Sequence, residues 1–304
     1  MLTVSNYHYI RPNFNTPYPS IFGVTPEAFQ MQLQLLKNEG DYIHPKDLLA
    51  NYETILHSKD HFIFITFDDG LKEQYDYALP ILDQLNIPAV FFANSLNYEE
   101  KRASTVHKIH LLRSILSPET LLENLSKTEI NPLSSTDILH AKTIYRYDDA
   151  ESAALKYLLN FKMSFAVQEQ VIQEIFDNYF KEKEVVASLY MKDEMLKDLA
   201  QRGYLGSHTH RHLPLGLLDL ENIQFELEHS KSFFENLTNT SIAMISYPYG
   251  TSEACTKEVV DLTKKAGYTL GFTTQRGVND ATNDTLLLNR FDCNDLIGGK
   301  NYKQ

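Results

Sequence analysis

The chain has 304 residues, 43% of them hydrophobic and 22% charged, which is enough apolar side chain for a large folded core. This composition excludes an intrinsically disordered protein. The formal net charge is −12, and no stretch is a run of Lys and Arg. These features exclude the basic surface that nucleic-acid binding requires.

The start of the chain, Met1 to His8, lacks the basic and apolar regions of a secretory signal. No later apolar run reaches the ~18 residues of a membrane-spanning helix. We therefore expect a cytoplasmic protein without an integral membrane segment, provided the chain is complete. Cys255 and Cys293 are the only cysteines, too few for a disulfide framework or a Cys-rich zinc site, and we expect structural thiols.

Short β-prone apolar runs alternate with helical patterns along most of the chain. The expected strands are Leu2–Tyr7, Phe62–Phe67, Ile87–Ala93, Tyr204–Ser207, Ile242–Tyr247, Tyr268–Thr273 and Leu286–Phe291. The expected helices are Thr25–Gly40, Leu71–Leu85, Asp193–Gln201, Leu220–Leu237 and Glu253–Ala266. The alternation predicts a parallel sheet covered by helices, and about seven such units suit a barrel or an open doubly wound sheet.

Residues 97–188 interrupt this alternation. They contain no clear strand, but their apolar residues recur at helical spacing, as in Leu111, Leu112, Ile115 and Leu116. We interpret the segment as a helical insertion within a single catalytic domain that spans residues 1–304. Three roles stay open for it: a structural buttress, a lid over the site, or an oligomer contact.

Two adjacent carboxylates, Asp68 and Asp69, follow the apolar run that ends at Phe67. Carboxylates near apolar surroundings are costly unless something pairs with them, and a metal cation would do so. His208 and His212 follow a later predicted strand. Because α/β enzymes place their sites where parallel strands end, the two segments together predict a hydrolytic metal site.

The spacing of the histidines bears on which of them are ligands. His208 and His212 are separated by ~13 Å in an extended strand, whereas a turn brings them together and directs His210 away. Two imidazoles with Asp69 as third ligand leave positions open for water and substrate, as in catalytic metal sites. Asp68 would then be free to act as general base.

With these motifs the chain resembles the polysaccharide deacetylases, the NodB-homology family of carbohydrate esterases. The segments that resemble the three motifs of this family, in the same order, are Thr66-Phe67-Asp68-Asp69-Gly70, His208-Thr209-His210-Arg211-His212 and Tyr247-Pro248-Tyr249-Gly250. The resemblance covers most of the chain outside the insertion. It implies a distorted (β/α)7-type barrel, a divalent metal, and amide hydrolysis on an N-acetylated sugar.

Carried over by residue, the resemblance implies that Asp68 is the base and that Asp69, His208 and His212 hold the metal. The backbone amide of Tyr249 would donate to the oxyanion. Two imidazoles and a carboxylate suit Zn²⁺ best, with Fe²⁺, Co²⁺ or Ni²⁺ as alternatives.

The chain departs from the family pattern at two places. Many relatives have an arginine two residues before the proline of the third motif, where it pairs with the base, but this chain has Ser246. Arg290 is the candidate to replace that arginine, and Arg11 is a weaker one. Many relatives also supply a C-terminal histidine as general acid, yet no histidine follows His229.

The N-terminal segment Tyr7-His8-Tyr9-Ile10 offers a replacement for that histidine. It resembles the Tyr-His motif of a circularly permuted subset of the family, which includes bacterial poly-N-acetylglucosamine deacetylases. In this subset His8 would be the general acid that protonates the leaving amine.

The predicted function is metal-dependent removal of an N-acyl group, above all N-acetyl, from a carbohydrate or sugar precursor of surface polysaccharide. The partner is thus an N-acylated sugar, met in the cytoplasm or at the inner membrane face, and oligomers could form through the insertion. Alternatives are a deformylase, an amidase acting on a non-sugar amide, and an inactive carbohydrate-binding homologue.

Overall fold

The computed structural model describes residues 1–127, 131–144 and 149–302, which form two compact units. The barrel unit consists of Met1–Asn13, Gly23–Arg102 and Val186–Gln304, and the helical unit consists of Phe14–Phe22 and Ala103–Val185. The helical unit lies within the predicted insertion except for Phe14–Phe22, whereas residues 97–102 and 186–188 of that insertion belong to the barrel unit. Residues 128–130 and 145–148 of the predicted insertion lie outside the described residues.

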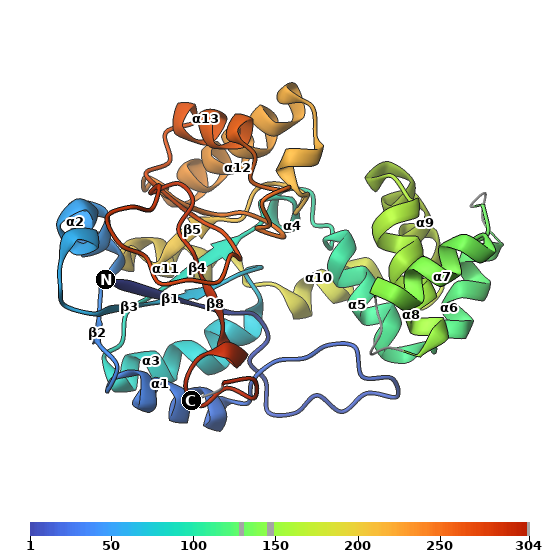
Figure 1. The fold of residues 1–304 in the computed structure, drawn as a ribbon, viewed down its shortest axis with the longest axis horizontal. Helices are drawn as coiled ribbons and strands as arrows, with labels where there is room; N and C mark the ends of the chain where they lie inside the picture. The colour runs from blue at the N-terminus through green and yellow to red at the C-terminus, as the bar shows by residue number, and fades with distance from the viewer. Residues whose placement is uncertain (128–130, 145–148, 303–304) are drawn as a thin grey trace. The chain divides into compact units, whose positions relative to one another are not determined.

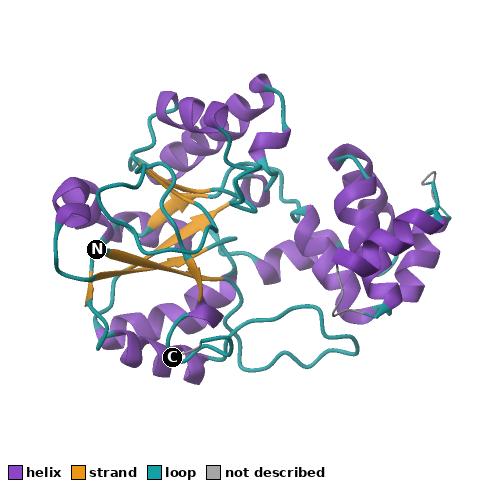
Figure 2. Ribbon diagram, in the orientation of Figure 1, coloured by secondary structure: helices purple, strands orange, loops and turns teal. Residues whose placement is uncertain are grey.

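The barrel unit contains a parallel sheet surrounded by helices (Figure 2). Its strands are β1 (Leu2–Tyr7), β2 (Asp41–Tyr42), β3 (Phe62–Phe67), β4 (Ala89–Ala93), β5 (Leu205–Ser207), β6 (Met244–Ser246), β7 (Leu270–Phe272) and β8 (Phe291–Asp292). Their order is β7-β6-β5-β4-β3-β1-β8, with β2 paired to β3, and every pairing is parallel. This curled parallel sheet confirms the predicted distorted barrel.

An irregular segment before β8 connects the two ends of the sheet. Thr273, just after β7, donates its N–H to the carbonyl of Leu288 at 2.8 Å, whereas Phe291 pairs with Ser5 of β1. The segment therefore changes neighbours between these positions. Leu287 donates its N–H to the carbonyl of Asp284 at 2.9 Å, so the start of the strand predicted over Leu286–Phe291 lies in a turn. The prediction is therefore wrong in extent, and only Phe291–Asp292 is a strand.

Helices lie around the strands, with α1 and α3 below them and α12 and α13 above them in the view of Figure 1. The helical elements of the barrel unit are α1 (Pro26–Leu36), α2 (Pro45–His57), the π-helix η1 (Gln74–Ala78), α3 (Leu79–Leu85), α4 (Leu96–Glu99), α11 (Asp193–Arg202), η3 (Leu215–Leu217), α12 (Leu220–Thr238), α13 (Lys257–Lys265) and η4 (Cys293–Asp295). Among the described residues, no helix has both the length and the apolar character needed to cross a membrane.

The helix predicted over Leu71–Leu85 contains a π-helical turn, Gln74–Ala78. Pro80 lies just beyond this turn and has no N–H to give to the carbonyl of Asp76, so the regular helical pattern fails there. The side chain of Gln74 is completely buried and donates to the carbonyl oxygens of Asp68, at 2.6 Å, and His8, at 2.9 Å. The turn thus ties the segment after β3 to the segment after β1.

Alternating side chains of the strands fill the interior of the barrel unit. Val4, Phe64 and Met244 belong to one buried apolar cluster, which also includes residues of α2. Side chains two residues apart along a strand share a face, so Phe64 and Thr66 point the same way, and Asp68 continues this series beyond β3. The candidate catalytic carboxylate therefore lies above the apolar interior.

The helical unit has an apolar core of its own. It contains α5 (Thr105–Ile115), α6 (Pro118–Ser126), α7 (Ser135–Ile144), α8 (Ala150–Tyr157), the π-helix η2 (Leu158–Lys162), α9 (Phe165–Phe176) and the first part of α10 (Glu182–Leu189). Leu112, Leu121, Leu155 and Ile172 are completely or almost completely buried in this core. Figure 1 draws α5 to α9 of this unit in shades of green.

Candidate metal and catalytic site

The predicted site residues come together at the carboxyl ends of the strands. Asp68 and Asp69 follow β3, His208 follows β5, and Tyr249 follows β6 by three residues. His8 follows β1, the neighbour of β3. The parallel order of the strands explains why segments so far apart in sequence share one edge.

Asp69, His208 and His212 form a compact cluster of metal-ligating atoms. The Oδ1 atom of Asp69 lies 3.6 Å from Nε2 of His208 and 3.4 Å from Nε2 of His212. The three ligand atoms lie within 4.8 Å of one another, and all three side chains are at least 90% buried. Donors bound at about 2.1 Å to a tetrahedral ion are about 3.4 Å apart, so this donor set fits one divalent ion.

Left-handed backbone conformations shape the cluster. Asp69 has a φ of 79°, Thr209 of 66° and His212 of 59°. Such angles cost non-glycine residues about 1–3 kcal/mol each and concentrate at functional sites. The chain does turn after β5, as the histidine spacing requires, but it does so through this irregular loop and not through a helical turn.

The environment of His208 fixes its tautomer. Its Nδ1 lies 2.7 Å from the carbonyl oxygen of Ser246, which can only accept, so Nδ1 carries the hydrogen. The lone pair of a neutral Nε2 then faces Asp69. This arrangement is typical of metal-binding histidines, in which a hydrogen bond from the other ring nitrogen orients the imidazole. Burial lowers the pKa of His208 to about 4, which keeps the ring neutral at pH 7.

Asp68 is buried in a two-point ion pair with Arg290. Nη1 of Arg290 donates to Oδ1 at 2.9 Å and Nη2 donates to Oδ2 at 2.8 Å. Burial alone would raise the pKa of Asp68, but the guanidinium outweighs burial and holds this pKa well below its ordinary value. The carboxylate is therefore charged at neutral pH.

The irregular segment before β8 positions Arg290. Its Nε donates to the carbonyl of Thr273 at 2.8 Å, and its Nη atoms also donate to the hydroxyls of Thr66, at 3.2 Å, and Ser246, at 2.8 Å. Ser246 thus accepts from the arginine through its side chain and from His208 through its backbone. Arg11, the weaker candidate, pairs with Glu73 at 2.6 Å.

His8 lies at the opening of the site. Its Nε2 is 3.9 Å from Oδ2 of Asp68, and 39% of its side chain is exposed. The two hydrogen bonds from the Gln74 side chain to the carbonyls of His8 and Asp68 hold the segments that carry these residues against each other.

Tyr249 also lies at the opening, on the turn that follows β6. Its φ is 63°, the residue is 46% exposed, and its ring centroid is 5.6 Å from that of His212. The Thr274 hydroxyl donates to the carbonyl of Tyr249 at 2.7 Å. Gly250 has a φ of 56°, and a Cβ there would come within 2.4 Å of the Thr274 amide nitrogen, so the turn requires glycine.

His210 belongs to a different cluster, away from the three predicted ligands. Its Nδ1 lies 2.8 Å from the Ser95 hydroxyl, and its Nε2 lies 3.3 Å from Glu100. Ligand atoms of Glu99, His210 and His229 lie within 4.8 Å of one another. Sequence reasoning assigned His229 no such role, because Glu99 and His229 lie on separate helices and no motif spacing connects them.

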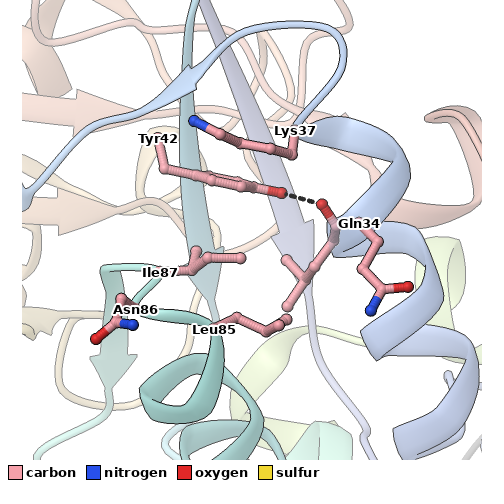
Figure 3. Close-up of a pocket in the computed structure, with 7 residues that line it drawn as sticks. Gln34, Lys37, Tyr42, Leu85, Asn86 and Ile87 are labelled. Atoms are coloured by element: carbon pink, nitrogen blue, oxygen red, sulfur yellow. Dashed lines mark hydrogen bonds between the residues drawn. The ribbon is translucent and has the colours of Figure 1, made fainter.

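A separate pocket of about 360 Å³ lies on the barrel unit between α1, β2 and the loop before β4 (Figure 3). Its lining residues are Leu33, Gln34, Lys37, Tyr42, Leu85, Asn86 and Ile87, and the Tyr42 hydroxyl donates to the carbonyl of Leu33 at 2.6 Å. Tyr42 pairs with the start of β3, so the pocket is near the amino ends of the strands. It contains none of the predicted site residues.

Comparison with known families identifies the class of this barrel. The polysaccharide deacetylase family matches residues 57–127 and 149–271, more than half of the chain. The chain therefore belongs to the polysaccharide deacetylase family, which confirms the resemblance seen in the motifs. The matched segments contain Asp68, Asp69, His208, His212 and Tyr249, whereas His8 and Arg290 lie outside them.

One individual relative agrees with this assignment. YxkH of Bacillus subtilis (strain 168) is 35% identical over 89 residues, which are 29% of this chain and 31% of that protein. The match thus spans about a third of the length of that relative.

Solved structures share the fold over 96% of this chain. They include the Streptococcus pyogenes deacetylase PplD in complex with acetate (TM-score 0.58, 18% identity, 91% of that chain) and IcaB from Ammonifex degensii (0.56, 16%, 91%). A de-N-acetylase from Aggregatibacter actinomycetemcomitans has a TM-score of 0.57 at 14% identity over 95% of its chain. At these identities the likeness is one of fold.

Proposed function

We propose that this protein is a metal-dependent hydrolase that removes an N-acyl group, with N-acetyl preferred, from a carbohydrate of surface polysaccharide metabolism. One observation carries the proposal. The cluster of Asp69, His208 and His212 adjoins a buried carboxylate, Asp68, that is held in its charged form by Arg290. Family membership and the acetate complex of the S. pyogenes deacetylase support the choice of an acetamide.

Asp69, His208 and His212 would hold one divalent ion, Zn²⁺ by preference and Fe²⁺, Co²⁺ or Ni²⁺ otherwise. Such an ion, when bound, polarises a carbonyl oxygen and lowers the pKa of water. The Nδ1–H of His208 donates to the carbonyl of Ser246 and so directs Nε2 toward the ion.

Asp68 would accept the proton that water loses as it attacks the acyl carbon. A base must be unprotonated at the working pH, and the pairing with Arg290 keeps Asp68 so. Both carboxylate oxygens already accept from the guanidinium, which fixes the plane of the carboxylate. Arg290 is therefore a positioning residue in this proposal.

His8 would protonate the leaving amine. It comes from the neighbouring strand β1, its Nε2 lies 3.9 Å from Asp68, and its partial exposure lets a substrate reach it. The proton taken by Asp68 and the proton given by His8 balance the reaction, since water and an amide become a carboxylic acid and an amine. The backbone N–H of Tyr249 would donate to the oxyanion.

A substrate panel tests the proposed function. Metal-replete wild type should release acetate, with an equal amount of free amine, from N-acetylated oligosaccharides faster than from N-formyl sugars or non-sugar amides. Asp68→Asn should abolish release, because the amide cannot take the proton. Faster turnover of the N-formyl or non-sugar amides would instead indicate a deformylase or amidase, and no turnover of any substrate would indicate an inactive homologue.

A cytoplasmic location and contact between copies through residues 97–188 remain predictions from the sequence. Cell fractionation and the solution mass of the full chain would test them.

A further inference from the structure

A second group of metal-ligating side chains lies on three elements of the barrel unit. Glu99 is the last residue of α4, His210 is in the loop after β5, and His229 is on α12. Nε2 of His229 lies 2.6 Å from Oε2 of Glu99, and the two imidazole rings have centroids 4.7 Å apart. One ligand atom from each of the three lies within 4.8 Å of the other two.

The chemistry of this group favours a transition-metal ion. Glu100 brings a second carboxylate, with Oε1 at 3.3 Å from Nε2 of His210. Two imidazoles with one or two carboxylates form a donor set for Zn²⁺ and its neighbours, whereas Ca²⁺ and Mg²⁺ prefer oxygen alone. The partial exposure of Glu99 (39%) and His229 (34%) leaves space for an ion to enter and for water to complete its coordination.

His210 is held as a ligand would be. Its side chain is 97% buried, and Ser95 lies 2.8 Å from Nδ1 and can accept the hydrogen of that nitrogen. Nε2 then faces the carboxylates, the pattern in which an outer partner orients a ligating imidazole. Phe225 contacts both rings, stacked on His229 at 4.7 Å and edge-on to His210 at 5.5 Å.

A simple ion pair accounts for less of this geometry. His229 and Glu99 would form such a pair by themselves, and exposed pairs contribute about 0–1 kcal/mol. The pair does not require a buried imidazole from a third element, nor a second carboxylate facing that imidazole.

We propose that Glu99, His210 and His229, with Glu100 beside them, bind a second divalent ion of the Zn²⁺ class. The ion would join α4, α12 and the loop that contains His208 and His212. Leu96 already donates its N–H to the carbonyl of His210 at 3.2 Å, so the ion would reinforce an existing contact of that loop. The role is structural and independent of the proposed deacetylation.

Zn²⁺ uptake by the full chain tests the proposal. Chelator-treated protein is dialysed against buffered Zn²⁺, and bound metal is measured by mass spectrometry. Wild type should take up about two ions per chain, and Glu99→Gln, His229→Ala should take up about one. The matched control, Glu228→Gln, His57→Ala, changes a glutamate and a histidine outside the cluster and should still bind about two.

Asp69→Ala distinguishes metal binding at the two sites, because it removes a ligand of the first site and leaves the loop that contains His208, His210 and His212 unchanged. It should bind about one ion, and its combination with Glu99→Gln, His229→Ala should bind none. If the site of Asp69, His208 and His212 does not bind metal, Asp69→Ala has no effect on Zn²⁺ uptake. The double variant Glu99→Gln, His229→Ala still binds one ion fewer than wild type.

Thermal unfolding gives a second readout. Zn²⁺ should raise the Tm of Asp69→Ala, and this rise should vanish when Glu99→Gln, His229→Ala is added, with the metal-free Tm unchanged. Should the double substitution impair folding, Glu99→Gln alone replaces it. Equal Zn²⁺ uptake by wild type and either variant of this cluster overturns the proposal.

Discussion

Arg290 and Asp68 are 222 positions apart in sequence, yet they form a buried ion pair with two hydrogen bonds of 2.9 and 2.8 Å. The side chains are 1% and 3% exposed. Asp68 follows a regular strand, whereas Arg290 comes from the irregular segment that connects β7 with β1. The protonation state of the candidate base therefore depends on the way the barrel closes.

Arg290→Lys should lower kcat at least ~10-fold while the protein stays folded, because an ammonium preserves the charge but cannot make the two-point contact. Arg290→Ala should lower kcat further and reduce the free energy of unfolding by about 3–5 kcal/mol, since a buried carboxylate loses its partner. Steady-state kinetics and urea unfolding measure these effects. Arg276→Lys, at an exposed arginine, is the matched control, and an equal loss in this variant would count against the special role of Arg290.

The position of Ser246 suggests a swap experiment. The family resemblance implies an arginine at this position in many relatives, whereas here the Ser246 hydroxyl accepts from Arg290 at 2.8 Å. Ser246→Arg alone should be inactive, because two guanidinium groups would compete for one buried space. The double variant Ser246→Arg, Arg290→Ala should be at least ~10-fold more active than Arg290→Ala alone. This gain corresponds to a coupling free energy of about 1.4 kcal/mol between the two neighbouring positions. Simple additivity in this double-mutant cycle would argue against replacement of one arginine by the other.

His8→Gln should lower kcat on an acetamide by about 10²–10⁴-fold, because the amine leaves poorly without a proton. An aryl acetate ester needs no such proton, so its hydrolysis should fall much less. Zn²⁺ content and Tm should stay at the wild-type values, since His8 is partly exposed. His57→Gln provides an exposed histidine control. Undiminished acetamide hydrolysis by His8→Gln would remove His8 from the general-acid role.

The helical unit should lose stability in acid through Glu182. Its carboxylate lies 2.6 Å from the buried ammonium of Lys108. Burial alone would raise the pKa of Glu182, but the Lys108 and Ala103 hydrogen bonds outweigh burial and lower this pKa below its ordinary value. A carboxylate whose pKa is lower in the folded state stabilises the fold at pH values above its unfolded-state pKa. This contribution to the free energy of unfolding is lost as the pH falls through the folded-state pKa.

Glu182→Gln should therefore destabilise the protein at pH 7 by about 1.5–3 kcal/mol, and this deficit should shrink as the pH falls below the ordinary glutamate pKa. Urea unfolding as a function of pH measures the effect, and hydrogen exchange of the α5 amides shows whether it is located in the helical unit. Glu174→Gln, at an exposed glutamate of α9, should show neither the loss nor its pH dependence. A deficit that does not vary with pH would exclude the assigned ion pair as its cause.

Local patterns were enough to predict the fold and the neighbourhood of the site. Apolar runs that end in Asp68 and His208 indicate strands with polar residues at their carboxyl ends, and the parallel sheet confirms this arrangement. The choice between Arg290 and Arg11 had no local signal, because it depends on how the segment before β8 crosses from β7 to β1. Sequence patterns also gave no indication of Gln74, whose inward direction follows from a π-helical turn.

The central claim is that Asp69, His208 and His212 hold the ion on which hydrolysis depends. The most direct measurement is acetate release from an N-acetylated oligosaccharide by chelator-treated protein as Zn²⁺ is restored, with wild type, Asp69→Ala and Glu99→Gln, His229→Ala in parallel. We predict that activity returns with Zn²⁺ in wild type and in Glu99→Gln, His229→Ala, and stays absent in Asp69→Ala. Full activity in the chelator-treated wild type, or restored activity in Asp69→Ala, would contradict the claim.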